Sequence, residues 1–284
     1  MTKKVIACID SSPYAEAVCD YATWAAKRLN VTMSVLHVLS KTQQQDSSDL
    51  SGSIGLGAQE ALLEKLAKLD AEHGKLALER GRIMLDAARA RAAAAGFEQV
   101  EERLRHGDFV ETAIELEEET RLLVMGKRGA SSADAHGRLG LQVEPLIRNV
   151  HKPVLLTQQK YKEPQQVMLA YDGSATALKG LEMLAGSPLV KGLPVHLVMA
   201  GADVDATRIQ MEQAASILRK SGFSTTIAIV AGEPETVLHQ YQQQHDIDLM
   251  VMGAYGHSRI RQFIVGSTTT AMLSHAKCSL LILR

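Results

Sequence analysis

The strongest constraint on the fold is that the chain carries one pattern twice. "VIACIDSS" from Val5 matches "VMLAYDGS" from Val167, and each is a short apolar run that ends in an aspartate and small polar residues. "RLLVMGKRG" from Arg121 likewise matches "DLMVMGAYG" from Asp248. A repeat on this scale, in a chain of 284 residues, predicts two domains built on one plan.

Within each copy, short apolar runs alternate with helical patterns. Runs such as "LLVMG" are apolar throughout, which is typical of strands covered on both faces of a parallel sheet. The first copy predicts strands at 4–9, 31–38, 99–105, 121–126 and 153–157, with helices near 14–28, 58–95, 109–119 and 140–149. The second predicts strands at 166–171, 194–200, 223–230, 248–253 and 278–283, with helices near 175–188, 204–221, 233–245 and 266–275.

The expected fold class is therefore α/β, with two doubly wound parallel-sheet domains. We expect the domains to span 1–158 and 165–284. The polar segment "QQKYKEPQQ" between the copies contains proline and has the character of a linker.

The first copy differs from the second by an insertion between its second and third strands. A polar loop rich in Ser and Gly leads into an Ala-, Leu- and charge-rich helical region at 58–95. We interpret this region as a covering helix that is extended at one end and broken near Gly74 or Gly81. The alternative is an arm that projects to contact a protein partner.

Composition limits where the chain works and what it binds. The net charge of -1 gives no overall field that would attract nucleic acid or an anionic membrane. The three cysteines, Cys8, Cys19 and Cys278, are scattered, so neither a disulfide framework nor a zinc site is expected. No apolar run is long enough to span a bilayer, and we expect a cytoplasmic protein.

A glycine-rich stretch follows the fourth strand of the second copy. Gly253 comes directly after "LMVM", Gly256 follows three residues later, and Gly266 with Ser267 begins the next helix. Glycine lets the backbone approach a phosphate, and the N–H groups and hydroxyls of a helix start can donate to it. His257 would add positive charge. Taken one by one, these residues are common in turns and at helix N-caps. Only their spacing indicates a phosphate site.

That spacing resembles a known signature. "MGAYGHSRIRQFIVGS" is similar to the G-x2-G-x9-G-[ST] motif of universal stress proteins, and "VMLAYDGS", "DLMVMG" and "SHAKCSLLIL" extend the resemblance. It covers nearly the whole chain except the linker and the insertion. It implies a Rossmann-like five-stranded sheet of order 3-2-1-4-5 in each half. It also implies a pseudo-dimer in which the last strands of the two halves pair, and a homodimer stays open.

The resemblance further implies a nucleotide site in the second half. In the ATP-binding members of the family, adenine lies near the aspartate after the first strand and near the end of the second strand. The implied cofactor is ATP with Mg²⁺, and the metal would arrive with the nucleotide because no carboxylate pair here would hold it alone. For the aspartate, the alternative is a turn residue bonded to nearby backbone. The implied site residues are Asp172, Ala200, Gly253, Gly256, His257, Gly266, Ser267 and Thr268.

The first copy departs from the signature. Its spacing from Gly129 to Gly140 is one residue too long, and Leu141 stands where the motif has a hydroxyl. A leucine offers a phosphate no donor, so we expect this half to be degenerate for ATP and to act as a structural or regulatory partner. Weaker site candidates here are Asp10, Gly126 and Gly129, and nearby Lys127, Arg128 and Arg138 leave weak anion binding open.

No sequence pattern requires catalysis. HExxH and GxSxG are absent, and no Cys–His pair has a recognisable spacing. The resemblance, with the motif intact in the second copy and eroded in the first, implies a nucleotide-responsive stress or signalling module rather than a dedicated catalyst. The alternatives are an interaction scaffold that binds no nucleotide and a slow ATP hydrolase.

Overall fold

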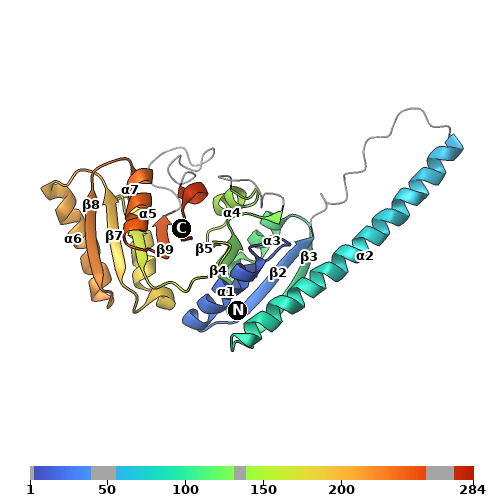
Figure 1. The fold of residues 1–284 in the computed structure, drawn as a ribbon, viewed down its shortest axis with the longest axis horizontal. Coiled ribbons are helices and arrows are strands. Elements are labelled where there is room, and N and C mark those ends of the chain that lie inside the picture. The colour runs from blue at the N-terminus through green and yellow to red at the C-terminus, as the bar shows by residue number, and fades with distance from the viewer. Residues whose placement is uncertain (1–2, 40–55, 131–138, 254–271) are drawn as a thin grey trace.

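The computed structural model describes residues 3–39, 56–130, 139–253 and 272–284. Their strands form one ten-stranded sheet in the order β3-β2-β1-β4-β5-β10-β9-β6-β7-β8 (Figure 1). The first half contributes β1 (Lys4–Cys8), β2 (Met33–Leu39), β3 (Val100–His106), β4 (Thr120–Gly126) and β5 (Val154–Thr157). The second contributes β6 (Val167–Ala170), β7 (Val195–Ala200), β8 (Thr225–Val230), β9 (Leu249–Gly253) and β10 (Ser279–Leu283).

The strand order confirms the predicted fold class. Each half has the order 3-2-1-4-5 in its own numbering, and the strand pairs within each half are parallel. The halves meet where β5 and β10 pair in antiparallel fashion, with Leu155 opposite Leu281. This confirms that the last strands satisfy each other's edges, which removes two exposed strand edges from the molecule.

The helices follow the predicted alternation but differ at their ends. They are α1 (Ala15–Leu29), α2 (Leu56–Ala94), α3 (Phe109–Glu115), α4 (Val143–Asn149), α5 (Ala175–Ala185), α6 (Asp205–Lys220) and α7 (Pro234–Gln244). The predicted helices 109–119 and 175–188 were too long, because each ends early and gives way to a short 3-10 turn, η2 (Glu117–Glu119) and η4 (Pro188–Val190). The predicted helix at 266–275 lies partly outside the described residues, which show it from 272 to 275.

Helix α2 corrects one prediction. It is unbroken through Gly74 and Gly81, where we expected a break. A Cβ atom at Gly81 would lie 2.8 Å from Cδ1 of Leu104 and 3.1 Å from Cδ2 of His37. This glycine therefore lets the helix approach β2 and β3 closely, instead of ending it. The helix covers these strands with its C-terminal part, and its N-terminal part extends away from the sheet (Figure 1).

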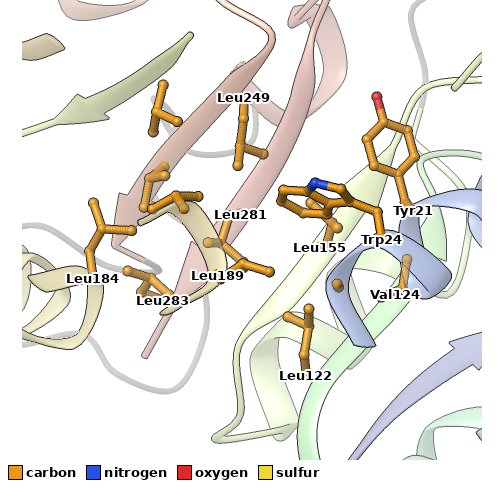
Figure 2. Close-up of a cluster of buried hydrophobic side chains, with 14 of the residues drawn as sticks. Tyr21, Trp24, Leu122, Val124, Leu155, Leu184, Leu189, Leu249, Leu281 and Leu283 are labelled. Atoms are coloured by element: carbon orange, nitrogen blue, oxygen red, sulfur yellow. The ribbon is translucent and has the colours of Figure 1, made fainter. Parts of the chain in front are cut away.

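Two clusters of buried hydrophobic side chains each contain residues of both halves. A cluster of buried side chains joins Trp24 of α1 and Leu155 of β5 to Leu281 of β10 and Leu189 of η4. Figure 2 shows Trp24 between the leucines of the second half and the side chains of the first. Because burial of apolar surface is the main stabilising term in folding, this shared cluster ties the halves together.

The predicted linker is docked on both halves. The ring of Tyr161 packs edge-on against Tyr21 of α1, with the ring centroids 4.8 Å apart. On the other side, Nζ of Lys162 lies 2.5 Å from Oδ1 of the buried Asp248. The backbone N–H groups of Gln165 and Gln166 donate to Oδ2 of the same carboxylate. No helix within the described ranges is long and apolar enough to cross a membrane.

Candidate functional site

Three of the predicted site residues lie at one edge of the sheet. Ala200 ends β7, Gly253 ends β9, and Asp172 follows the end of β6, which lies between those two strands. The parallel registers align Ala170 with Val198 and Leu169 with Val251, so the three strand ends are level. In an open parallel sheet, ligands bind at such carboxyl ends where the chain order reverses, here between β6 and β9.

Asp172 is exposed and organises the turn that leads into α5. Its Oδ1 accepts a hydrogen bond of 2.9 Å from the backbone N–H of Ser174. Ser174 is the N-cap of α5, and its Oγ accepts from the N–H of Ala177. Gly173 between them has φ +75, a conformation that favours glycine.

This geometry includes the turn role that we considered as the alternative for Asp172. It also leaves the second carboxylate oxygen, Oδ2, without a hydrogen-bond partner among the described residues. The turn bond and a ligand bond would use different oxygens. A free, exposed carboxylate oxygen at a strand end is an acceptor for an amino or hydroxyl group of a ligand.

Gly253 has a packing reason to be glycine. A Cβ atom there would lie 3.3 Å from Cγ2 of Thr176, in the first turn of α5. The equivalent glycine of the first half, Gly126, is tighter still, because its Cβ would lie 2.6 Å from Cβ of Tyr14. Both strands therefore end under the helix that follows the first strand of their half, whether or not a phosphate binds nearby.

The remaining predicted site residues lie outside the described residues. These are Gly256, His257, Gly266, Ser267 and Thr268. The structure thus brings together the strand-end part of the predicted site, and the glycine motif beyond Gly253 stays a prediction.

The corresponding edge of the first half is closed by its own backbone. Oδ1 of Asp10 accepts from the N–H of Ser12 at 3.0 Å, and Oδ2 accepts from the N–H of Ala130 at 2.9 Å. A Cβ at Gly129 would lie 2.9 Å from the same Oδ2. Both oxygens of Asp10 accept hydrogen bonds, whereas among the described residues only Oδ1 of Asp172 does.

The glycine that begins the next segment of the first half is also engaged. The N–H of Gly140 donates to the carbonyl oxygen of Lys127 at 2.9 Å, and a Cβ at Gly140 would lie 3.1 Å from N of Gly129. This bond holds Gly140 against the loop after β4, so α4 begins later than predicted, at Val143. Leu141, expected to press into a phosphate position, is 73% exposed.

Lys127, the first basic residue of the first-half loop, does not line an open site. Lys127 is buried, and its Nζ donates to the carbonyl oxygen of Ala276 in the second half at 2.5 Å. Burial, with a smaller repulsion from Arg128, lowers the pKa of Lys127 to about 8. Lys127 is therefore directed away from any anion at the strand ends, and Arg138 lies outside the described residues.

Two cavities within the described residues lie away from these strand ends. One of about 410 Å³ is lined by Trp24, Tyr161 and charged residues of α1. Several of its polar groups already have partners, since Asp20 accepts two hydrogen bonds from Arg91 and Arg28 donates to the carbonyl of Leu189. The described ranges contain no group of His, Cys, Asp and Glu side chains arranged to hold a metal ion.

Gln210 was missed at the sequence level, and Lys127 was named there only as a neighbour of a weak anion site. Gln210 of α6 lies over the Asp172 turn, with its Nε2 3.4 Å from the carbonyl oxygen of Gly173. Helical periodicity predicts α6 but does not say which residue reaches across to the neighbouring turn. Lys127 follows a strand-end glycine, and no local signal shows that its side chain enters the other half.

Comparisons with known proteins agree with this architecture. A family model described as "Universal stress protein family" matches residues 1–158 and 196–284. Universal stress protein Slr1230 of Synechocystis sp. is 36% identical over 286 residues, covering 99% of this chain and 100% of that protein.

Two solved structures resemble the whole chain. A universal stress protein from Archaeoglobus fulgidus DSM 4304 has a TM-score of 0.72 at 21% identity, covering 99% of this chain and 98% of that one. A functionally unknown protein from Pseudomonas aeruginosa PAO1 has a TM-score of 0.60 at 16% identity, covering 99% and 92%. At these identities the likeness concerns the fold.

Proposed function

Because the chain belongs to the universal stress protein family, we propose that its second half binds one adenine nucleotide, ATP in the first instance. Nucleotide occupancy then alters the contacts of the chain with protein partners in a stress response. The proposed domains are 1–158 and 165–284, and the proposed binding site belongs to the second.

The observation that carries this proposal is the difference between the two strand-end aspartates. Among the described residues, Oδ2 of Asp172 has no hydrogen-bond partner beside the ends of β7 and β9, whereas both oxygens of Asp10 accept hydrogen bonds from backbone. A carboxylate oxygen suits the exocyclic amine of adenine, which is a donor. Ala200, at the neighbouring strand end, presents a small side chain that leaves room for the base.

The phosphates are assigned to the glycine motif that begins at Gly253. Their charge needs donors, and backbone N–H groups with the hydroxyls of Ser267 and Thr268 are the donors in the sequence. Gly256, His257 and Gly266 complete the proposed site. Mg²⁺ is proposed to accompany the phosphates, since the described residues offer it no cluster of ligands.

The first half is proposed to hold no nucleotide. The N–H groups of Ala130 and Gly140, which would be candidates for phosphate contact, donate to Asp10 and Lys127 of the same half. Opening this site would break both bonds. A structural role for the first half follows, in agreement with its departure from the motif.

Isothermal titration of the full chain with ATP and Mg²⁺ tests the proposal. We expect about one site per chain with micromolar affinity, and weaker binding in Gly266→Val and in Asp172→Asn. The asparagine still accepts from Ser174 through its amide oxygen, so the turn is retained while the charge is removed.

Asp246→Asn is the matched control. Asp246 is exposed, follows α7 at the opposite edge of the sheet, and has φ +49, which asparagine tolerates. Its binding should equal that of the wild type. A folded wild-type chain that binds no adenine nucleotide would overturn the proposal and favour the nucleotide-free scaffold, for which the projecting part of α2 is the supporting observation.

A further inference from the structure

Helix α2 carries an apolar stripe that no part of the described chain covers. Leu69, Leu76 and Ile83 are 50%, 62% and 62% exposed. They are seven residues apart, so they lie on one side of the helix about two turns from each other. Large apolar side chains exposed in a row, in contrast to scattered ones, indicate a contact surface.

The stripe faces away from the sheet. The buried residues of α2 are Gly81, Leu85, Ala88 and Ala92, which form the side that packs on β2, β3 and α1. At 100° per residue, Ile83 lies about 200° from Gly81, on the opposite side. The stripe is therefore not the margin of the intramolecular contact.

From residue 64 to residue 80, the helix contributes no side chain to the described hydrophobic cores. No residue from 64 to 80 is buried, and Figure 1 shows this part extending beyond the sheet. The full helix of 39 residues is about 58 Å long. Helices without tertiary contacts are marginal in water, so a second helix against the stripe would supply the missing stabilisation.

We propose that α2 pairs with α2 of a second copy of this chain, in an antiparallel coiled coil formed by these stripes. A heptad repeat of large apolar residues matches another copy of itself, and a two-fold axis then makes both surfaces identical. Leu69 of one copy packs against Leu76 of the other, and the axis passes near residue 72.

The charges beside the stripe favour the antiparallel direction. One flank of the stripe is lined by charged residues. They are Lys65, Glu72 and Glu79, which precede the three stripe residues by four positions each. In an antiparallel pair this flank meets the same flank of the other copy, which places Lys65 beside the opposite Glu79. The two Glu72 side chains approach each other at the axis, as the single like-charge contact of this flank.

A parallel pair would be less favourable. Arg80 lies on the stripe side between Leu76 and Ile83 and is exposed. Parallel pairing would set Arg80 against Arg80 of the other copy across the seam. In the antiparallel pair the two Arg80 side chains lie at opposite ends of the contact, each level with Lys65 of the partner helix, where the stem of Arg80 can cover apolar surface and its charge can reach water.

Sedimentation equilibrium of the full chain at tens of micromolar, without nucleotide, tests the proposal. The wild type should be a dimer, and the Leu69→Glu/Leu76→Glu variant a monomer with unchanged secondary structure by circular dichroism. Ile209→Glu is the matched control, because Ile209 is 60% exposed on α6, and it should remain a dimer. A monomeric wild type, or a dimer that survives the double substitution, would overturn the proposal.

Cysteine cross-linking tests the direction. The three native cysteines are buried, so a cysteine introduced on α2 is the reactive one. A mixture of Lys65→Cys and Glu79→Cys chains should form a mixed disulfide dimer under mild oxidation, and Lys65→Cys alone should not. Absence of the mixed dimer, or efficient self-linking of Lys65→Cys, would refute the antiparallel arrangement.

Discussion

Nζ of Lys127 lies 2.5 Å from the carbonyl oxygen of Ala276, and this hydrogen bond joins the two halves of the chain. Lys127 belongs to the loop after β4, and Ala276 lies shortly before β10. Gln158 also donates to the same carbonyl through Nε2, at 3.1 Å. A buried ammonium group thus sits at the junction of the halves.

Lys127 should leave a signature in the pH dependence of stability. Its pKa is lowered from 10.5 to about 8, so the folded chain disfavours its charged form. The unfolded chain binds the proton more tightly between these values, and stability contributed by this group therefore rises with pH. From pH 8 to pH 10 the wild type should gain about 2 kcal/mol relative to Lys127→Met, measured by urea unfolding of both proteins.

The comparison with Lys127→Met removes the effects of other groups that titrate in this range. Lys179→Met, at an exposed position of α5, is the control. Its difference from the wild type should not change between the two pH values. If the difference in unfolding free energy between the wild type and Lys127→Met were also independent of pH, the ammonium would be solvated in the folded chain.

Alanine at the two strand-end glycines should have unequal effects. At Gly126 the new Cβ would meet Cβ of Tyr14 at 2.6 Å, which no side-chain rotation relieves. We expect Gly126→Ala to lower the free energy of unfolding by about 2 kcal/mol. At Gly253 the nearest atom, Cγ2 of Thr176, is 3.3 Å away and can shift, so Gly253→Ala should cost under about 1 kcal/mol. Denaturant midpoints measured on both variants would contradict this packing if the order were reversed.

Alanine at the two aspartates should separate stability from binding. Asp10→Ala leaves the N–H groups of Ser12 and Ala130 without their acceptor, at a cost of about 1 kcal/mol, and should leave ATP affinity unchanged. Asp172→Ala removes one backbone contact but should weaken ATP binding about tenfold, or about 1.4 kcal/mol. Unfolding and titration of both variants check the pair. Equal losses of affinity would show that the first half also binds nucleotide.

Asp248 should control access to the linker. It is buried, accepts from the N–H groups of Gln165 and Gln166, and pairs with Lys162. Asp248→Ala should lower stability by about 2 kcal/mol, because several donors lose one acceptor. It should also speed trypsin cleavage at Lys160 and Lys162.

Asp205→Ala, at an exposed position of α6, supplies the reference rate for that digestion. If the linker of Asp248→Ala were cut no faster than this reference, its docking would depend on Tyr161 rather than on the carboxylate.

The repeat made the fold predictable from sequence. The observed start of β4 is within one residue of the predicted one. Continuous apolar runs of this length are typical of strands that a doubly wound sheet buries on both faces. Helix ends were less predictable because they depend on tertiary contacts. Gly81 shows this well, since its role follows from the approach of Leu104, which lies on a strand 23 positions later in the sequence.

The candidate site was predictable in part. Strand-end positions such as Asp172 and Gly253 follow from the pattern, because parallel strands bring their carboxyl ends to one edge. The occupancy of the Asp10 oxygens and the direction of the Lys127 side chain do not, because each depends on a partner supplied by a distant segment. The sequence pattern therefore located the strand ends in both halves. Only the three-dimensional contacts distinguish the strand-end aspartate of the first half from that of the second.

The antiparallel pairing of β5 with β10 places the carboxyl ends of the two sets of strands at opposite edges of the sheet. All strands of the first half run one way and all strands of the second run the other, so their loop-bearing ends open on opposite sides of the shared sheet. A macromolecule seated on the loops of the first half would leave the nucleotide site proposed for the second half exposed to solvent. Under the proposed function, one chain could therefore hold a protein partner and a nucleotide at the same time, at opposite edges of the sheet.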